Sequence, residues 1–456
     1  MARVLAVLLL FASLVAPAVA GDDSLEARAK QWLAPVIESG TLKGVSIGVI
    51  RPDGEQFAFG LGPARDDGAA SCGPQTIFEI GSITKVFTAL LLADMVERGE
   101  VKLDDPAQKY LPEGVKLSVK DDKPITLASL SSHTSGLPRL PNNLAPKDAH
   151  NPYADYDEER LDAFLNQYKL RHAPGERVAY SNLGVGLLGH LLARQAGISY
   201  EALVIERVCR PLGMDETSIT LSAAQQRELA KGHDADGAPE SNWDLNVLQG
   251  AGALRSSVND MLKLLAAASG RKASPLDAAF RLTEQPRAQM AGGAQVGLGW
   301  HLSDSDQLIW HNGGTGGYRS FCGFRADDRV AVVVLANSAN DIVDVIGFKL
   351  IDMARGKAVD PLAIRQVADV AEEALERHVG KYSLAGVGVL TITREGKQMY
   401  AQLTGQPRAQ IFAEGENEFF YRAVDAQITF EPGKDGGTAA LVLHQGGQDL
   451  RAVRQK

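Results

Sequence analysis

Strand-like patterns lie near both ends of the first 340 residues of this chain, and helical patterns fill the stretch between them. An apolar run at 44–50, turn residues at 52–54 and a second run at 56–60 predict an early β-hairpin. Four more strand-like segments follow the helical centre, at 296–302, 307–310, 318–324 and 330–335. Because strands need partners, this distribution predicts one antiparallel sheet built from both ends and flanked by helices, with an all-helical region inserted between them. The expected fold class is α/β, in the α+β sense.

The helical and strand patterns also divide the chain into domains. Apolar residues recur at helical spacing at 24–38, 86–96, 183–195, 258–268 and 344–354, and a charged helical stretch covers 365–377. Beyond residue 378 come short alternating segments typical of a small all-β domain, at 387–393, 398–404, 418–423, 427–431 and 438–444. We therefore expect a main domain at 21–358, a helical linker at 359–379 and an all-β domain at 380–456.

The composition is that of an ordinary globular protein, with 45% hydrophobic and 23% charged residues. It excludes wholesale disorder and a small disulfide-stapled scaffold. The formal net charge is −9 and no block of basic residues occurs, which argues against a nucleic-acid partner. Cys72, Cys209 and Cys322 lie far apart, so at most one disulfide can form. The histidines are scattered and H-E-x-x-H is absent, so we expect neither a metal site nor a cofactor.

The first twenty residues have the composition of a signal peptide. Arg3 supplies the positive start, an apolar run covers 4–15, and Ala18-Val19-Ala20 provides a cleavage site. The run is too short to span a bilayer, and no second stretch of about 18 apolar residues follows. The sequence thus predicts an exported protein, periplasmic or secreted, with no membrane span after cleavage. A retained N-terminal anchor is the alternative.

The segment Gly81-Ser82-Ile83-Thr84-Lys85, at the head of a helical pattern, is the sharpest candidate for chemistry. Ser82 and Lys85 are three residues apart, so on a helix they share a face and the amine can reach the hydroxyl. A serine hydroxyl attacks only when a neighbour takes its proton, and a lysine that is desolvated or crowded by another cation can do so. The helix N-terminus adds free N–H groups where an oxyanion would form.

The same S-x-x-K spacing occurs a second time, at Ser269-Gly270-Arg271-Lys272. This copy stands at the polar end of a helical pattern, and nothing around it predicts a preorganised site. We interpret it as a chance match. A capping serine with a solvated lysine is the alternative interpretation of the first copy as well.

Two further sequence elements support a catalytic role for Ser82 and Lys85. In Tyr180-Ser181-Asn182, a phenol whose pKa is lowered by nearby cations could relay protons, and the Asn182 amide could hold a substrate carbonyl or the lysine. After a strand-like run, His311-Asn312-Gly313 opens a glycine-rich stretch, and the N–H of Gly314 could join that of Ser82 as an oxyanion donor. Taken singly, the two elements also fit a loop tyrosine with a capping asparagine and a tight hairpin with a surface histidine.

Together and in this order, the three elements resemble the active site of the serine penicillin-recognising enzymes, the family of class C β-lactamases, D-Ala-D-Ala carboxypeptidases and esterases. The resemblance runs from about residue 43 to 340 and includes the segments 103–106, 110–112, 133–138 and 210–214. It implies a β-lactamase/transpeptidase-like fold and a serine hydrolase that cleaves an amide of a peptidoglycan stem peptide or of a β-lactam.

The resemblance also implies roles for individual residues. Ser82 is acylated, Lys85 and Tyr180 share the acid and base work, and Asn182 orients the substrate. The C-terminal all-β segment resembles the lipocalin-like appendage of some family members.

One motif departs from the β-lactamases of this group, which carry K-T-G where this chain has His311-Asn312-Gly313. We expect these residues to contact substrate, but a neutral histidine and an asparagine supply less positive charge for a carboxylate. Arg319 is a candidate replacement for that charge. The departure leaves open an esterase or D-aminopeptidase of the same fold without β-lactam turnover. A non-catalytic binding protein of the cell envelope is the other alternative.

Two other features are expected to be structural. The segment 184–189 matches G-x-G-x-x-G, but no buried strand precedes it, so we attribute its glycines to close helix packing. His133 precedes the Ser135-Gly136 turn, and we expect it to have a structural role and not to act as a base.

Overall fold

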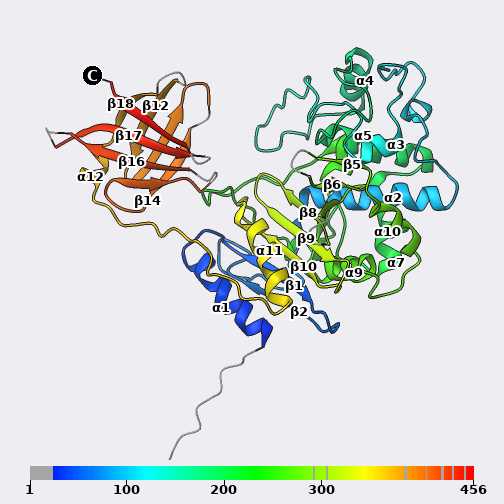
Figure 1. The fold of residues 1–456 in the computed structure, drawn as a ribbon, viewed down its shortest axis with the longest axis horizontal. Coiled ribbons are helices and arrows are strands. Elements are labelled where there is room, and N and C mark those ends of the chain that lie inside the picture. The colour runs from blue at the N-terminus through cyan, green and yellow to red at the C-terminus, as the bar shows by residue number, and fades with distance from the viewer. Residues whose placement is uncertain are drawn as a thin grey trace, which may run out of the picture.

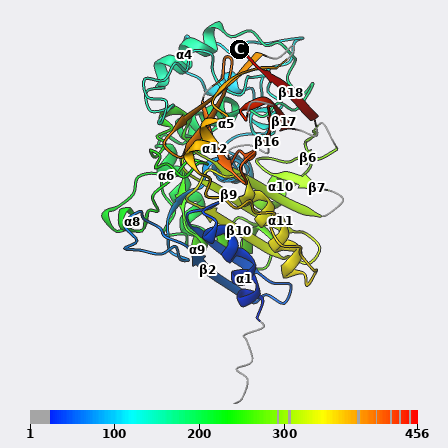
Figure 2. The same ribbon diagram turned by 90° about the vertical axis from the view of Figure 1, so that its left-hand side faces the viewer.

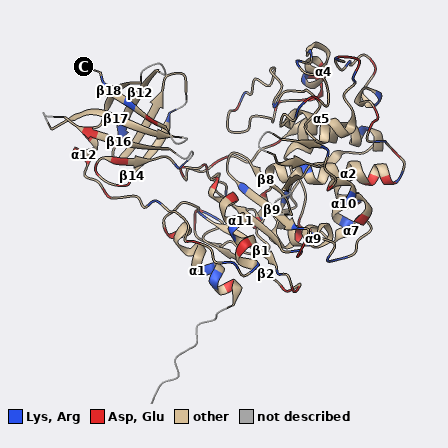
Figure 3. Cartoon of the chain, in the orientation of Figure 1, with Lys and Arg blue, Asp and Glu red and all other residues tan. Residues whose placement is uncertain are grey.

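The computed structural model describes residues 24–290, 293–303, 307–384, 388–406, 408–422, 426–433, 436–445 and 448–455. The predicted signal peptide at 1–20 lies outside these residues. A large α/β body and a small β-barrel stand side by side, joined by an extended segment (Figure 1). Basic and acidic residues are scattered over both bodies (Figure 3).

The central sheet of the large body contains strands from both ends of the main domain, as the sequence predicted. It is antiparallel, with the order β2-β1-β10-β9-β8-β7-β6-β5. The strands are β1 Val45–Ile50, β2 Gln56–Leu61, β5 Ala288–Gln289, β6 Gln295–Val296, β7 His301–Ser303, β8 Leu308–Gly314, β9 Arg319–Arg325 and β10 Ala331–Ala336. β1 and β10 pair along their whole length and are buried at every position, because helices cover both faces of the sheet.

The helices form two layers and an inserted region. α1 Leu25–Glu38 and α11 Ile342–Ala354 cover one face, and α2 Thr84–Glu97 and α9 Val258–Ala268 lie against the other (Figures 1 and 2). The remaining helices are α3 Leu127–Ser131, α4 Glu158–Gln167, α5 Asn182–Ala196, α6 Tyr200–Val204, α7 Arg210–Leu212, α8 Ala223–Glu228 and α10 Asp277–Thr283. Shorter turns are η1 Gly81–Ile83, η2 Ala107–Tyr110, η3 Ile205–Cys209 and η4 Asn246–Ala251, and a two-strand ladder joins β3 Phe78–Glu79 to β4 Arg255–Ser256. No helix in the described part of the chain is long and apolar enough to cross a membrane.

The segment predicted as one strand at 296–302 is two strands, β6 and β7. Gly299 turns the chain between them with a left-handed backbone, φ +70°. The turn packs directly on α2, since a Cβ on Gly299 would lie 2.6 Å from the Lys85 carbonyl oxygen. The sharp reversal therefore depends on a glycine that strand periodicity does not detect.

The predicted helical linker is wrong over most of its length. Only α12 Glu372–Glu376 is helical, and the preceding chain is extended. The Ala368 N–H donates to the carbonyl oxygen of Ala413 in the barrel (2.8 Å), and Val370 is buried in the barrel's apolar cluster. The barrel thus gives this segment's backbone and apolar side chains the partners that a helix would otherwise supply. The segment therefore stays extended although its apolar residues have helical spacing.

The C-terminal all-β domain is a closed barrel of eight strands. They are β11 Gly380–Leu384, β12 Gly388–Glu395, β13 Gln398–Leu403, β14 Ala409–Ala413, β15 Glu418–Phe420, β16 Ala426–Pro432, β17 Thr438–Gln445 and β18 Gln448–Arg454. The sequence predicted five of them and missed β11, β14 and β18. β11 and β18 close the barrel by pairing with each other. The hydrophobic pattern of a single strand does not show which other strand it pairs with.

The barrel contacts the large body through Arg422. Its guanidinium donates to the Ser39 carbonyl oxygen (3.2 Å), and Asn340 donates to the Arg422 carbonyl oxygen (3.5 Å). The three cysteines are free and buried, so no disulfide contributes to the fold.

The packing of α11 on β9 can be tested at Gly347. A Cβ there would lie 2.7 Å from Cε1 of the fully buried Phe321 ring, and closer still to Cδ1. We expect Gly347→Ala to lower the free energy of unfolding by about 1–3 kcal/mol, measured by urea denaturation. Gly73→Ala is the control, because a Cβ at Gly73 meets nothing within 4 Å. An unchanged midpoint for Gly347→Ala would contradict this account of the interface.

Candidate active site

Ser82 lies in the 3-10 turn η1, which joins β3 to α2. Gly81 has a left-handed backbone, φ +50°, and a Cβ there would come within 2.6 Å of the Gly314 nitrogen. Glycine is therefore required for the serine turn to approach β8 this closely. The Ser320 hydroxyl of β9 donates to the Ile80 carbonyl oxygen (2.8 Å) and fixes the start of the turn to the sheet.

Lys85 stands on the first turn of α2 with a side chain that is 0% exposed. Its Nζ lies 2.8 Å from Ser82 Oγ and 2.6 Å from the carbonyl oxygen of Ala251, at the end of η4. Burial lowers the pKa of Lys85 well below its usual 10.5, and the charge of Arg139 lowers it further. The amine is thus held against the hydroxyl and favoured in the neutral form that can accept a proton.

Tyr180 comes from the loop before α5 and shares a hydrogen bond with Ser82. Its ring centroid lies 4.9 Å from Lys85 Nζ. Tyr180, from a distant part of the sequence, therefore meets Ser82 and Lys85 at one point. Burial raises the pKa of Tyr180 to about 12, outweighing the Ser82 hydrogen bond and the Arg139 charge, which both lower it. The expectation of a lowered phenol pKa is wrong, because it took the cations into account and not the desolvation.

His133 holds the segment that carries Tyr180. Its Nδ1 accepts a hydrogen bond from Ser181 N–H (3.2 Å), and its carbonyl oxygen accepts one from Ala179 N–H (2.8 Å). The rings of His133 and Tyr180 are 4.4 Å apart. His133 thus has the structural role that the sequence predicted: it holds the residues immediately before and after Tyr180 and so positions the tyrosine.

The free edge of β8 borders the serine turn. β7 pairs with β8 only as far as Trp310, so beyond that residue β8 faces η1. The N–H of Thr315 donates to the carbonyl oxygen of Tyr318, the residue before β9 (3.1 Å). Because bonding alternates along an antiparallel ladder, the N–H of Gly314 points away from β9 toward η1. A Cβ on Gly313 would come within 2.9 Å of the Ser82 nitrogen. The N–H groups of Ser82 and Gly314 therefore border one spot, which is the arrangement that an oxyanion hole needs.

His311 is 1% exposed and lies between two aromatic rings of the site. Its ring is 6.3 Å from that of Tyr180 and 4.8 Å from that of His301. Nδ1 lies 2.5 Å from the Asn312 carbonyl oxygen, and buried Nε2 has no hydrogen-bond partner among the residues that the structure describes. Burial lowers the pKa of His311 well below 6.5, with the charges of His301 and Lys85 adding to the effect, so the imidazole is neutral.

Asn312 faces the other side of the sheet. Its Nδ2 donates to Asp344 of α11 (2.6 Å), as the alternation of side chains along a strand requires when His311 faces the site. This placement disagrees with the prediction that Asn312 contacts substrate. Arg319 also differs from expectation, because its guanidinium forms an ion pair with Asp341. The candidate replacement for the missing positive charge is thus neutralised by a neighbouring carboxylate.

Asn182 lies at the first position of α5, close to the site but away from the lysine. Its Nδ2 is 3.5 Å from the Tyr153 hydroxyl. Oδ1 is buried and has no hydrogen-bond partner within the described ranges, where no bond to Lys85 occurs either. The amide is therefore available to a substrate and does not hold the amine.

A buried ion pair that sequence reasoning missed supports the serine turn. Glu79 is 3.0 Å from Arg255 across the β3–β4 ladder, and its carboxylate also accepts hydrogen bonds from Asn242 Nδ2 and Trp243 N–H, both 3.0 Å. A lone acid within the apolar segment 76–83 is the one sequence signal that could have pointed to it. The partner could not be identified, because it lies far along the chain.

The other candidate motifs lie elsewhere. Ser269 is the C-cap of α9 and its hydroxyl donates to the Ala266 carbonyl oxygen (3.4 Å), while Lys272 is exposed. In the G-x-G-x-x-G segment, a Cβ on Gly186 would lie 2.8 Å from Leu248 Cδ2, which confirms close helix packing. No cluster of three or more histidine, cysteine, aspartate or glutamate residues suited to a metal ion occurs in the described part of the chain.

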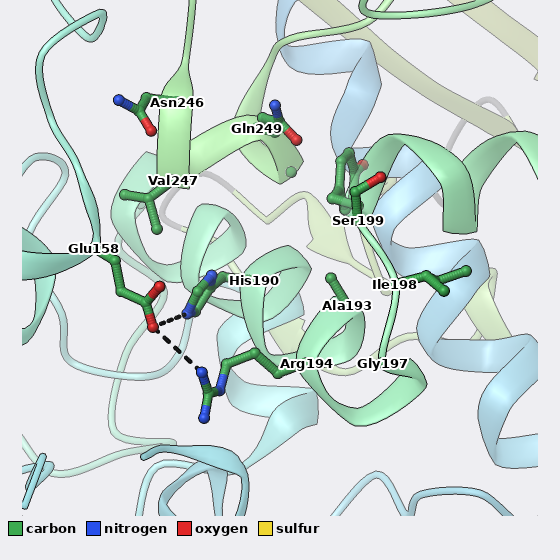
Figure 4. A pocket seen from close by; sticks show the side chains of 12 residues that line it. Glu158, His190, Ala193, Arg194, Gly197, Ile198, Ser199, Asn246, Val247 and Gln249 are labelled. Atoms are coloured by element: carbon green, nitrogen blue, oxygen red, sulfur yellow. Dashed lines mark hydrogen bonds and ion pairs between the residues drawn. The ribbon is translucent and has the colours of Figure 1, made fainter.

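A cavity of about 480 Å³ opens between α5 and η4. Figure 4 shows its charged groups, with Glu158 directed toward His190 and Arg194. The Glu158 carboxylate is 3.6 Å from His190 Nε2 and 3.3 Å from Arg194. Since these charges are paired with one another and none of the three belongs to the Ser82 cluster, we assign this cavity no part in the chemistry.

Three histidines of the site, of which His133 and His311 are buried and His301 half-buried, should remain neutral at pH values where an exposed one is charged. Burial lowers the pKa of His133 to about 3 and of His301 to about 4, and that of His311 falls well below 6.5. Exposed His150, beside Glu240, has a raised pKa. We expect NMR of ¹³C-histidine-labelled protein to show neutral signals for these three rings at about pH 5, with His150 protonated.

These depressed values also determine how stability depends on pH. Below about pH 6.5 the unfolded chain takes up protons that the folded chain does not, so the free energy of unfolding should fall as the pH drops from about 6.5 toward 4. A buried ring that titrates near pH 6.5 would contradict the assignment.

Comparisons with known proteins agree with this geometry. The beta-lactamase family model matches residues 26–347, and a domain of unknown function, DUF3471, matches residues 365–454. The chain is 36% identical over 222 residues to the D-alanyl-D-alanine-carboxypeptidase/endopeptidase AmpH of Escherichia coli K12, covering 48% of this chain and 56% of that protein. It thus spans little more than half the length of that relative.

Two longer matches extend the comparison. The chain is 27% identical over 417 residues to penicillin-binding protein 4* of Bacillus subtilis, covering 84% of this chain and 88% of that one. A class C beta lactamase structure from Rhodobacter sphaeroides superposes with a TM-score of 0.62 at 26% identity, over 71% of this chain and 97% of that one. The fold, the convergent cluster and the family match lead to one conclusion: this chain belongs to the beta-lactamase family of serine hydrolases.

Proposed function

We propose that this protein is an exported serine hydrolase of the class C β-lactamase/D-Ala-D-Ala carboxypeptidase type, which cleaves an amide through an acyl-enzyme on Ser82. The observation that carries the proposal is the position of Lys85, whose fully buried Nζ lies 2.8 Å from the Ser82 hydroxyl. A buried amine beside a serine in a helix-end turn is the arrangement that nucleophilic catalysis requires. The names of the relatives, a carboxypeptidase and a penicillin-binding protein, support this substrate class.

In the acylation step, the neutral Lys85 amine takes the proton of Ser82 as Oγ attacks the carbonyl carbon of the substrate. One Lys85 N–H donates to the Ala251 carbonyl oxygen, which leaves the lone pair available to the hydroxyl. The N–H groups of Ser82 and Gly314 stabilise the oxyanion. Tyr180 then gives its proton to the leaving nitrogen and recovers one from the Lys85 ammonium, so the amine is neutral again when the acyl-enzyme has formed.

Deacylation repeats the sequence with water in place of the serine. Lys85 and Tyr180 together take a proton from the water, which attacks the ester, and Ser82 Oγ leaves with the proton returned to it. We propose that Asn182 and His311 bind substrate beside the reacting carbonyl, because Asn182 Oδ1 and His311 Nε2 are buried without a hydrogen-bond partner among the described residues. Gly313 lets the substrate backbone approach β8.

We propose the domain boundaries on the same grounds: a signal peptide at 1–20, a hydrolase domain at 21–358, a linker at 359–379 and a barrel domain at 380–456. The two family matches, at 26–347 and 365–454, support the two main parts. Export to the periplasm or the medium follows from the proposed signal peptide.

An esterase or D-aminopeptidase without β-lactam turnover is the second candidate. Neutral His311 and the Arg319–Asp341 ion pair favour it, because neither supplies a free positive charge at the end of β8 to bind a β-lactam carboxylate. Turnover of a chromogenic cephalosporin, a p-nitrophenyl ester and a D-Ala-D-Ala peptide, measured side by side, separates the two candidates.

The nucleophile can be tested with the second S-x-x-K copy as a matched control. We expect Ser82→Ala to abolish labelling by a fluorescent penicillin or a fluorophosphonate, because no acyl-enzyme can form. Ser269→Ala should label like the wild type, because the Ser269 hydroxyl bonds only to its own helix. Labels are read from a denaturing gel, and circular dichroism checks the fold. Labelling that persists in Ser82→Ala would refute the assignment of Ser82 as the nucleophile.

The proton roles can be tested at Tyr180. We expect Tyr180→Phe to lower kcat/KM by about 10²–10⁴, the usual contribution of a positioned acid or base. Tyr400→Phe, at a half-buried position of barrel strand β13, should leave kcat/KM unchanged.

The wild-type rate should rise with pH as Lys85 loses its proton, at a pKa well below 10.5. A loss of rate from ionisation of Tyr180 is not expected before about pH 12. A wild-type rate that falls as the lysine deprotonates would exclude Lys85 as the base.

A further inference from the structure

A second cavity adjoins the catalytic cluster and shares Tyr180 with it. It has a volume of about 390 Å³ and lies between the loop 136–142, the segment 171–180 and α4. The stacked rings of Phe164 and Tyr168, 5.0 Å apart, form an apolar wall. Three arginines, Arg139, Arg171 and Arg177, line the rest, and we call this cavity the arginine pocket.

The charges of the arginine pocket are of one sign. None of its lining residues is an aspartate or a glutamate. None of the three guanidinium groups forms an ion pair with a residue that the structure describes, and all three arginines are exposed. Glu176 lies beside the wall and the charge of Arg177 acts on it, but its carboxylate is bound by Ala173 N–H (2.9 Å) and faces His172 Nδ1 (3.2 Å), and it forms no ion pair with Arg177. In the cavity of Figure 4, by contrast, Arg194 is paired with Glu158.

Three unpaired guanidinium groups on one concave wall are unusual in a chain whose formal charge is −9. Like charges repel one another, so their proximity costs free energy unless an anion offsets it. Guanidinium groups bind carboxylates in a bidentate geometry, and a concave wall lined by charges of one sign concentrates the electric field that attracts an anion.

Arg139 connects the pocket to the chemistry. Its guanidinium carbon lies 5.2 Å from the Tyr180 ring centroid, and its charge lowers the pKa of Lys85. The carbonyl oxygen of Arg139 accepts hydrogen bonds from Asn182 N–H (3.0 Å) and Leu183 N–H (3.2 Å) at the start of α5. The pocket wall is therefore rigidly attached to the segment that positions the tyrosine.

We propose that the arginine pocket binds a carboxylate of the substrate while the scissile carbonyl lies at Ser82. The inference rests on the proposed function, because it takes the Ser82 cluster as the reaction centre. The opposite end of the cleft offers no free cation among the residues discussed, since Arg319 is paired with Asp341. The positive charge that recognises an anionic substrate is thus supplied from the Tyr180 side.

The carboxylate belongs either to the acyl part of the substrate or to its leaving group, and matched substrate pairs distinguish the two. Mono-p-nitrophenyl adipate and the neutral p-nitrophenyl adipamate test the acyl side. Diacetyl-L-lysyl-D-alanyl-D-alanine and its C-terminal amide test the leaving side. The variant is the double substitution Arg171→Gln/Arg177→Gln, which leaves Arg139 and its contact with Tyr180 in place.

We expect the double variant to lower kcat/KM by at least about tenfold for the charged member of one pair, the usual loss for hydrogen bonds to a charged group. The neutral member should change by less than about twofold. Arg28→Gln, a single charge removed from exposed α1, should affect none of the four substrates. An equal change for charged and neutral members, or no change in either pair, would overturn the proposal.

Direct binding keeps this test separate from that of the proposed function. Both tripeptides and both adipate compounds are titrated into Ser82→Ala protein by calorimetry, with and without the double substitution. The acid should bind at least about tenfold more tightly than its amide, and the double substitution should remove that difference. Acid and amide of equal affinity refute the pocket even where turnover is seen. A preference for the acid without any turnover or labelling of wild-type protein supports the pocket and refutes the proposed function.

Discussion

The burial of one lysine amine is the constraint on which the site depends. A charged ammonium loses its hydration when it is enclosed by protein, so Lys85, at 0% exposed, is favoured as the neutral amine. Every partner around it fits that state. The Ala251 carbonyl oxygen fixes one N–H and the Ser82 hydroxyl occupies the remaining side, while α2 is buried along nearly its whole length and keeps water away. A lysine in the same spacing but exposed, such as Lys272, has no reason to give up its proton.

The β3–β4 ladder holds the partners of Lys85 at a fixed separation. β3 leads into the serine turn, and β4 follows the segment that ends in Ala251, so two residue pairs set the distance between the hydroxyl and the carbonyl that the amine must bridge. The Glu79–Arg255 ion pair joins the same two strands, and Asn242 Nδ2 and the Trp243 N–H also donate to the Glu79 carboxylate. Separating a buried ion pair costs free energy, because each charge is then left buried without its partner. A shifted register of the ladder would separate Glu79 from Arg255 and is therefore disfavoured. The reacting groups are therefore positioned by elements of only two residues each.

The sheet, its main helices and the serine–lysine spacing could be predicted from the sequence because each depends on local periodicity. What failed depends on tertiary context. Because side chains alternate along β8 and His311 faces the site, Asn312 faces the other side of the sheet. Its partner Asp344 belongs to a helix that begins 30 residues away. The partner of Arg319, Asp341, also lies outside the local sequence, just before the same helix. The stretch at 365–377 has helical spacing, but backbone and side-chain contacts with the barrel keep most of it extended. Predicting the direction of the Tyr180 pKa shift requires knowing how far the phenol is removed from water, and the flanking residues in the sequence do not show this.

The electrostatic environment of Tyr180 determines which proton transfers it can make. The groups in contact with its ring are the amine of Lys85, favoured neutral, and the imidazoles of His133 and His311, kept neutral by burial. A phenolate there would have Arg139 as its nearby cation, at 5.2 Å from the ring, and that charge does not offset the desolvation. Burial thus favours the protonated phenol and the neutral amine before substrate arrives, which are the states that the acid and base roles we propose for Tyr180 and Lys85 require. A lysine at position 311, as in K-T-G, would add a second cation beside both groups and lower both pKa values, whereas neutral His311 leaves that balance to burial and to Arg139 alone.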